Sequence, residues 1–116
     1  MGSLADLQED IAPAEVASLH ERGEIQLVDV REPYEYEAGR IEGARHVETS
    51  RLTEEAGSFD KERPLVFYCR VGSRSAMVAQ AFRASGFKAY NMSGGLLSWT
   101  EQNLPLEPAG GSVADH

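Results

Sequence analysis

The residues of this chain that are best suited to nucleophilic chemistry surround its one cysteine, Cys69. The following segment, Arg70-Val71-Gly72-Ser73-Arg74-Ser75, combines two arginines with small side chains. A cysteine reacts as its thiolate, and nearby positive charge increases the thiolate fraction. Guanidinium groups and free backbone N–H groups also bind anions. The segment therefore predicts a nucleophilic thiol beside an anion-binding loop, in which exposed arginines contribute more to substrate binding than to stability.

A structural interpretation of Cys69 has to be weighed against this functional one. Free cysteine is among the most buried residue types, and a single cysteine after an apolar run is usually an inert core residue. Core cysteines, however, rarely have two arginines and a glycine in the segment that follows them. This combination, rather than the cysteine alone, favours the functional interpretation.

The elements around Cys69 are expected to place it where a parallel sheet binds its ligands. The run from Leu65 to Tyr68 is apolar without alternation, as in a strand buried on both faces, and the run from Gln26 to Val30 has the same character. A helix is predicted from about Ser75 to Ser85, ended by Gly86. Cys69 thus lies between the carboxyl end of a strand and a helix N-terminus, a position that favours anions.

The rest of the chain continues this alternation of strands and helices. The expected elements are a helix from Pro13 to Gly23, a strand from Lys88 to Met92, a turn at Gly94-Gly95 and a helix from Leu96 to Gln102. The alternation predicts an α/β fold with a central, mainly parallel sheet flanked by helices on both faces. One domain over residues 12–107 is expected, with a flexible N-terminal segment (1–11) and a flexible C-terminal tail (108–116).

The composition argues against several classes of partner. The 116 residues carry a formal net charge of −8 and no block of Lys or Arg, which disfavours nucleic acid and membrane surfaces. One cysteine forms no intrachain disulfide and no zinc-like cluster, so neither a metal nor a cofactor is expected. No apolar run has the length of a membrane span, and the acidic start is unlike a secretory signal. These features predict a cytoplasmic protein.

Three separated motifs resemble those of the rhodanese family: DVREPYEYEAGRIEGARH at positions 29–46, CRVGSRS at 69–75 and GFKAYNMSGGLLSW at 86–99. They occur in the family's order, and the resemblance extends from about Pro13 to Leu106. It implies the rhodanese fold and a sulfurtransferase, in which a cysteine takes sulfane sulfur from a small anionic donor such as thiosulfate. The persulfide then passes its sulfur to a thiophilic acceptor such as cyanide, a thiol or a protein.

The resemblance also implies roles for individual residues. Cys69 matches the nucleophile that forms the persulfide, and the segment from Arg70 to Ser75 matches the loop that wraps the sulfur and the anionic end of the donor. Asp29 and Arg31 match an acidic and a basic residue near that loop. Asp29 ends a strand at the same sheet edge, and we expect it to have a structural role, because an unpaired carboxylate near a thiolate would hinder the chemistry. Arg31 lies just beyond that strand and is expected to bind substrate or to orient the loop.

Four further residues are interpreted as peripheral or structural. Arg40 and Glu42 stand where the family more often has His and Pro, so the course of the local turn does not follow from the resemblance. His46 lacks the partner pattern typical of a general base, which favours a structural role. Trp99, beside two leucines, is expected in the core or in a pocket wall.

Two alternative functions stay open. A cysteine phosphatase or arsenate reductase also uses a thiolate in an anion-binding loop, but these enzymes place an arginine six positions after the cysteine. Here Arg74 comes five positions after Cys69, which suits a sulfur atom better than a phosphoryl group, and arsenate reduction commonly needs a second cysteine. The other alternative is a non-catalytic or sulfur-relay binding module, because a fold can outlast its activity. The sequence does not determine the oligomeric state.

Overall fold

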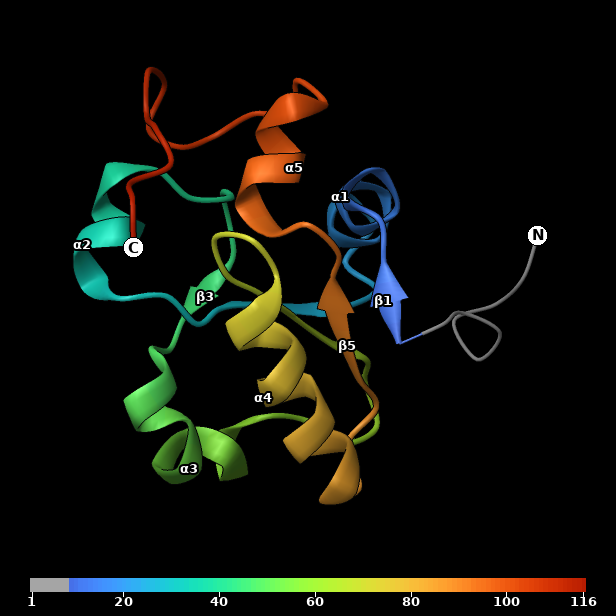
Figure 1. The fold of residues 1–116 in the computed structure, drawn as a ribbon. Coiled ribbons are helices and arrows are strands. Elements are labelled where there is room, and N and C mark those ends of the chain that lie inside the picture. Colours follow the sequence, from blue (N-terminus) through green and yellow to red (C-terminus); the bar gives the residue numbers. More distant parts are fainter. Residues whose placement is uncertain (1–8) are drawn as a thin grey trace.

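The computed structural model describes residues 9–116, which contain a five-stranded sheet in the order β1-β5-β4-β2-β3 (Figure 1). Each strand pairs in parallel with its neighbours. The strands are β1 (Asp10–Ile11), β2 (Gln26–Asp29), β3 (Arg45–His46), β4 (Leu65–Tyr68) and β5 (Ala89–Met92). The strand that precedes Cys69, β4, is therefore the central one.

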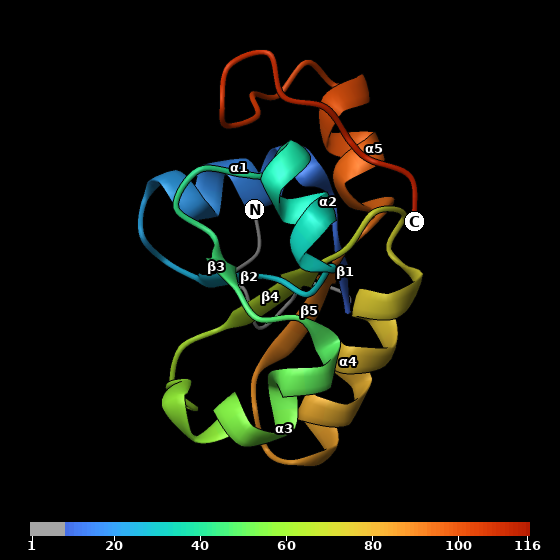
Figure 2. The ribbon, with the colours of Figure 1, turned by 90° about the vertical axis from the view of Figure 1, so that its left-hand side faces the viewer.

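Helices cover both faces of this sheet: α1, α2 and α5 lie on one face, and α3 and α4 lie on the other (Figures 1 and 2). None of the helices in the described part of the chain is long and apolar enough to cross a membrane. The α/β fold predicted from the sequence is confirmed. The helices are α1 (Pro13–Glu21), α2 (Pro33–Ala38), α3 (Leu52–Glu55), α4 (Ser73–Ala84) and α5 (Gly95–Glu101), with short 3-10 helices η2 (Thr49–Arg51) and η3 (Ala56–Ser58) on either side of α3.

The side chains of β4 alternate between two hydrophobic cores, because successive residues of a strand point to opposite faces of a sheet. Val66 and Tyr68 belong to the core that α1 and α5 cover. Leu65, Phe67 and Cys69 belong to the core that α3 and α4 cover. All five side chains are fully buried, which explains why this part of the sequence is apolar without alternation.

The predicted helices and strands agree with the observed ones except at their ends. The difference that matters most for the loop after Cys69 is the start of α4, which lies at Ser73 rather than at the predicted Ser75. Gly72 precedes it with a left-handed φ of +99°, a conformation that glycine adopts readily. The loop after Cys69 is therefore shorter than expected, and Ser75 is already helical.

The predicted N-terminal segment contains a strand that the sequence did not indicate. Residues 1–11 are predicted to be flexible, but Asp10 and Ile11 form the edge strand β1, in register with Asn91 and Met92 of β5. The Ile11 side chain is 2% exposed, and its burial stabilises the strand against fraying. The rest of the prediction, residues 1–8, lies outside the described residues.

The segment after α5 returns to α2 (Figure 1). The Ser112 N–H donates to the Ala38 carbonyl oxygen at 2.8 Å. The Tyr34 hydroxyl donates to the Asp115 carbonyl oxygen at 3.1 Å. These contacts place residues 112–115 beside α2, while the flexibility expected of residues 108–116 stays a prediction.

Candidate active site

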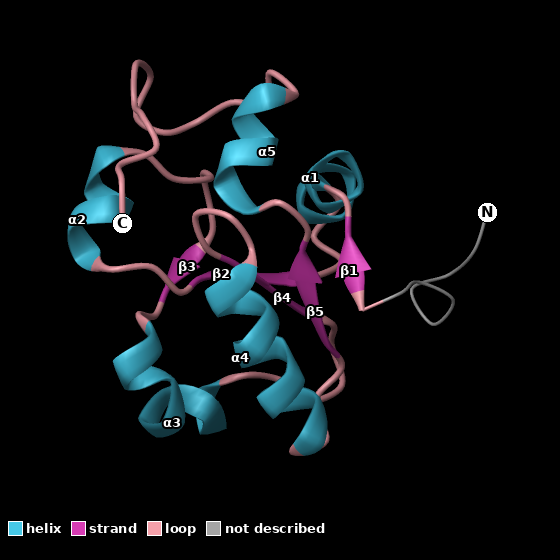
Figure 3. Cartoon of the chain, viewed as in Figure 1, coloured by secondary structure: helices cyan, strands magenta, loops and turns pink. Residues whose placement is uncertain are grey.

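Cys69 directly follows β4, and the loop that it begins leads into α4 (Figure 3). Three donors point at its Sγ: the N–H of Gly72 at 3.1 Å, the N–H of Ser75 at 3.4 Å and the Ser75 hydroxyl at 3.3 Å. Hydrogen bonds to a charged form favour that form. The structure therefore brings Cys69, Gly72 and Ser75 together in a cradle that suits a negatively charged sulfur.

Opposing influences act on the Cys69 thiol. Burial is the largest of them and raises the pKa, because it disfavours the charged form. Hydrogen bonds from Ser75 and Gly72 and the charge of Arg74 act in the other direction and prevail, so the pKa lies below its ordinary value. The Cys69 residue is 0% exposed. A substrate therefore reaches the sulfur only when the loop or its surroundings move.

The start of α5 anchors this loop from the side. The first residue of α5, Gly95, has a φ of +63°, and a Cβ there would lie 2.5 Å from the Arg70 carbonyl oxygen. The next two N–H groups of α5 donate to the carbonyl oxygens of Cys69 (2.9 Å) and Arg70 (3.0 Å). The turn predicted at Gly94-Gly95 is thus the element that fixes the backbone of the cysteine.

Arg74 is held by a partner that the sequence analysis missed. Its Nη1 and Nη2 each donate to one oxygen of Glu35 in α2, both at 3.0 Å. The Glu35 side chain is 0% exposed, and it also accepts from the Glu32 N–H at 2.9 Å. The two loop arginines, expected to be exposed, are both half-buried, with side chains that are 28% (Arg70) and 23% (Arg74) exposed. One feature of the sequence could have indicated α2: Glu32 and Glu35 are three residues apart, the spacing of a capping box, and they form one at the start of this helix.

Arg70 is the loop arginine that stays available to an anion. Its Nη2 pairs with Asp115 at 3.2 Å, but the Asp115 side chain is 97% exposed, and exposed ion pairs are weak. Its Nε is buried and has no hydrogen-bond partner among residues 9–116. An anion that enters the loop can therefore replace Asp115 and use an unpaired N–H group.

Asp29 and Arg31 form an ion pair in which both side chains are 0% exposed. The Arg31 Nε and Nη2 donate to the two Asp29 carboxylate oxygens at 2.9 and 2.7 Å, and Nη2 also donates to the Gly39 carbonyl oxygen at 2.8 Å. The structural role expected of Asp29 agrees with this geometry. Direct substrate binding by Arg31 stays a prediction; its guanidinium is buried, and its Nη1 has no hydrogen-bond partner among residues 9–116.

The other residues singled out in the sequence surround the site or lie in the core. Val71 and Ser73 are exposed positions of the loop and of the first turn of α4. The His46 Nε2 lies 2.7 Å from a backbone carbonyl oxygen, and its ring stacks on Tyr36 with 4.4 Å between the centroids. Trp99 is 3% exposed in the core. His46 and Trp99 thus have the structural positions expected of them.

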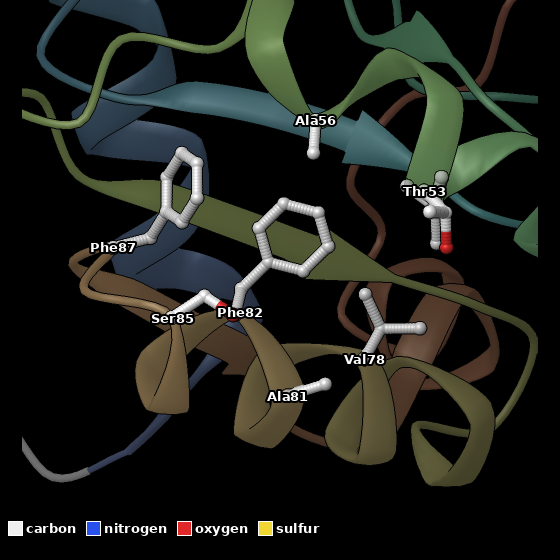
Figure 4. A pocket seen from close by; sticks show the side chains of 8 residues that line it. Thr53, Ala56, Val78, Ala81, Phe82, Ser85 and Phe87 are labelled. Atoms are coloured by element: carbon white, nitrogen blue, oxygen red, sulfur yellow. The ribbon is translucent and has the colours of Figure 1, made fainter.

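An apolar cavity of about 280 Å³ lies between α3 and α4, and Figure 4 shows Phe82 and Phe87 pointing across it toward Ala56. It is lined by Leu52, Thr53, Ala56, Val78, Ala81, Phe82, Ser85 and Phe87. None of these side chains is charged, and none of the site residues predicted from the sequence is among them. The cavity offers no group for acid–base or nucleophilic chemistry, so the chemistry is assigned to the loop after β4.

A comparison with protein families places the chain. Residues 12–102 match the rhodanese-like domain. The chain therefore belongs to the rhodanese-like domain family, and the resemblance of its three motifs is confirmed.

Individual relatives support the same assignment. The chain is 34% identical over 97 residues to the thiosulfate sulfurtransferase GlpE of Pseudomonas aeruginosa, which covers 83% of this chain and 87% of that protein. It is 40% identical over 75 residues to the uncharacterized protein YqhL of Bacillus subtilis, covering 64% of this chain but only 60% of YqhL. The crystal structure of a rhodanese-related protein from Thermoplasma volcanium matches with a TM-score of 0.78 and 26% identity, covering 84% of this chain and 95% of that one.

Proposed function

We propose that this rhodanese-like domain is a sulfurtransferase that carries sulfane sulfur from thiosulfate, or a similar anionic donor, as a persulfide on Cys69. The observation that supports this most strongly is the cradle of three hydrogen-bond donors around the Cys69 Sγ. A cradle of this kind favours the thiolate, which is the attacking form. The similarity to a thiosulfate sulfurtransferase of Pseudomonas aeruginosa adds support for the donor.

In the first half-reaction, the Cys69 thiolate attacks the outer sulfur of thiosulfate. A sulfur–sulfur bond to Cys69 forms as the sulfur–sulfur bond of thiosulfate breaks, and sulfite leaves with the bonding electron pair. The product is a Cys69 persulfide whose outer sulfur carries one negative charge, so charge is conserved. Arg70 is placed to bind the anionic end of the donor, because its buried Nε lacks a partner among the described residues.

In the second half-reaction, cyanide or a thiolate attacks the outer sulfur of the persulfide. The outer sulfur leaves as thiocyanate or as a new persulfide, and the electron pair of the broken bond returns to Cys69. A thiolate with a lowered pKa leaves faster. The hydrogen bonds of Gly72 and Ser75 that lower the pKa of the Cys69 thiol therefore assist this step as well. The acceptor is a small thiophile or a thiol of a partner protein.

The position of Arg74 disfavours the phosphatase alternative. A phosphatase needs its loop arginine to bind the phosphoryl group with two parallel hydrogen bonds. Here both terminal nitrogens of Arg74 bind the buried Glu35 carboxylate instead. Releasing them would leave Glu35 buried and unpaired, which is costly.

A non-catalytic module is the second alternative, and the intact cradle argues against it. A module that only binds has no need of three donors directed at a buried sulfur. The single cysteine, with no second one to form an intrachain disulfide, fits a reducing compartment such as the cytoplasm, which we propose as the location.

The proposed function is tested by mixing the protein with thiosulfate and cyanide and measuring thiocyanate. The wild-type protein should form thiocyanate catalytically, and Cys69→Ser should form none above the uncatalysed rate while keeping its circular dichroism spectrum. Hydrolysis of p-nitrophenyl phosphate should be no faster with the wild type than with Cys69→Ser. Phosphate release that depends on Cys69, without thiocyanate, would support the phosphatase instead, and neither activity would support the binding module.

A further inference from the structure

A polar chain, buried as far as Asn91, leads from the active sulfur to the exposed Asp10 at the edge of the sheet. The Ser75 Oγ lies 3.3 Å from the Cys69 Sγ and 2.5 Å from the Asn91 Oδ1. The Asn91 Nδ2 in turn donates to an Asp10 carboxylate oxygen at 2.9 Å. Ser75 is 0% exposed and Asn91 is 5% exposed, so the protein rather than water determines these contacts.

The orientation of the Asn91 amide follows from its neighbours. A carboxylate oxygen accepts hydrogen bonds, so the NH₂ group of Asn91 must face Asp10 and its oxygen must face Ser75. The sheet fixes this arrangement, because Asp10 of β1 lies opposite Asn91 of β5 in the parallel register. The Asn91 N–H also donates to the Glu9 carbonyl oxygen at 2.8 Å. Asn91 is thus held as an acceptor that faces Ser75.

The Ser75 hydroxyl has one proton and two acceptors within reach. While Cys69 is a neutral thiol, the shorter contact favours Asn91 as the acceptor. When Cys69 ionises, its charge makes the sulfur the stronger acceptor, because hydrogen bonds to charged groups are the stronger ones. The two acceptors therefore compete for the same proton.

We propose that Asn91 is a positioning residue for the reaction of Cys69, which it influences by competing with the sulfur for the Ser75 hydroxyl proton. The competition weakens the hydrogen bond to the thiolate and so keeps the sulfur more nucleophilic, since nucleophilicity falls as a thiolate is stabilised. Once the charge moves to the outer sulfur of a persulfide, the Ser75 proton can return to Asn91. The role in sulfur transfer rests on the proposed function, but the competition exists with or without it.

Charged groups lie near both acceptors of the Ser75 proton, the Cys69 sulfur and the Asn91 amide oxygen. On the side of the thiol, Arg74 of α4 adds its positive charge. On the side of Asn91, a polar cavity of about 350 Å³ is lined in part by Glu9, Asp10 and Arg83. Glu9 and Arg83 pair with each other at 3.1 Å. A substitution of Asn91 leaves all four charges in place, so a change in the titration of Cys69 reports the hydrogen bond.

The inference is tested by measuring the rate of Cys69 alkylation by iodoacetamide against pH. Only the pH midpoint is compared, because burial of the sulfur sets the absolute rate. Asn91→Leu removes the competing acceptor, and we expect the midpoint to fall by about half a pH unit to one unit. Asn91→Ala is a second variant of smaller volume that should shift the midpoint in the same direction, and it serves alone if Asn91→Leu does not fold.

The control is Asn91→Leu in a Ser75→Ala protein, which lacks the hydroxyl proton that Cys69 and Asn91 share. Ser75→Ala should raise the midpoint, and adding Asn91→Leu to it should cause no further shift. A merely structural Asn91 would lower the melting temperature without lowering the midpoint. An unchanged or raised midpoint in both single variants, or a shift that persists in the Ser75→Ala protein, would overturn the inference. A lowered midpoint in a protein that forms no thiocyanate would support the competition while contradicting the proposed function.

Discussion

Arg70 and Arg74 are held in the same loop by partners of different kinds. Arg74 makes two hydrogen bonds to a carboxylate that is 0% exposed, whereas Arg70 makes one to a carboxylate at the exposed surface. Removing one partner of a buried ion pair strands a charge, while an exposed pair contributes little. We therefore expect Arg74 to contribute mainly to the stability of the fold and Arg70 mainly to substrate binding.

The first prediction concerns these two side chains. Arg74→Ala should lower the free energy of unfolding by about 2–4 kcal/mol, because it leaves the Glu35 carboxylate buried without its partner. Arg70→Ala should change that free energy by less than about 0.5 kcal/mol. It should instead raise the KM for thiosulfate several-fold, because the loop loses its available cation. Urea unfolding and steady-state kinetics measure the two effects.

Arg51→Ala is a suitable control for both variants, because Arg51 is an exposed arginine that pairs with Glu54 and Glu55 on the surface. It should change neither the stability nor the KM appreciably. Equal losses of stability in Arg70→Ala and Arg74→Ala would contradict the account of the ion pairs. So would an unchanged KM in Arg70→Ala.

At the scale of elements, the active loop depends on the close approach of α5 to the end of β4. Gly95 permits this approach, since any Cβ there would meet the carbonyl oxygens of Arg70 (2.5 Å) and Cys69 (2.6 Å). Its φ of +63° is also unfavourable for other residues. Gly95→Ala should therefore destabilise the protein by about 2 kcal/mol or more. It should also displace the cradle, which raises the pKa of the Cys69 thiol and slows sulfur transfer.

Thermal unfolding and the alkylation midpoint of Cys69 test this prediction. Gly57→Ala is the matched control, because a Cβ on Gly57 would have no atom within 4 Å. The control should keep the wild-type melting temperature and midpoint. A Gly95→Ala protein that resembled Gly57→Ala in both measurements would contradict the claim that the close approach of α5 fixes the loop after β4.

The sequence predicted the elements that make up the catalytic half of the fold and missed the short ones. Strand β4, helix α4 and strand β5 follow one another with clear apolar patterns and glycine stops, so their order and the place of Cys69 could be predicted. Helix α2 has six residues and β3 only two, too few for a helical or strand period. Their stability comes from tertiary contacts, which are not visible in local sequence.

At the scale of the whole molecule, the partners of the site residues come from distant parts of the chain. Arg74 and Glu35 are 39 positions apart, Arg70 and Asp115 are 45 apart, and Ser75 and Asn91 are 16 apart. The sequence indicated which residues gather at the loop, because these residues are contiguous. It could not indicate their partners, because these pairings arise only when the sheet and its helices assemble.

The contact between Glu35 and Arg74, which forms only on folding, also predicts how the stability of the protein depends on pH. Burial is the largest influence on Glu35 and raises its pKa, but hydrogen bonds from Arg74 and from the Glu32 N–H, together with the Arg74 charge, bring the pKa below its ordinary value of 4.5. The unfolded chain therefore takes up the proton more readily than the folded one. The stabilisation by Glu35 is complete above its ordinary value and is lost as the pH falls through the lower folded value.

Urea unfolding of the wild type and of Glu35→Gln between about pH 7 and about pH 3 tests this linkage. Glu35→Gln should be the less stable protein at neutral pH, and the difference should shrink as the pH falls below the ordinary value. Glu37→Gln, which changes an exposed glutamate of the same helix, should match the wild type at neutral pH. A difference between wild type and Glu35→Gln that grows toward low pH would have the wrong sign.

The central claim is that Cys69 carries sulfur, and the mass of the intact protein tests it most directly. After incubation with thiosulfate and removal of the excess, the wild type should gain the mass of one sulfur atom. Cyanide should remove that mass with release of an equal amount of thiocyanate, and Cys69→Ser should gain nothing. A wild-type protein that gains no sulfur from thiosulfate, polysulfide or a persulfide donor, under conditions in which Cys69 can be alkylated, would contradict the account.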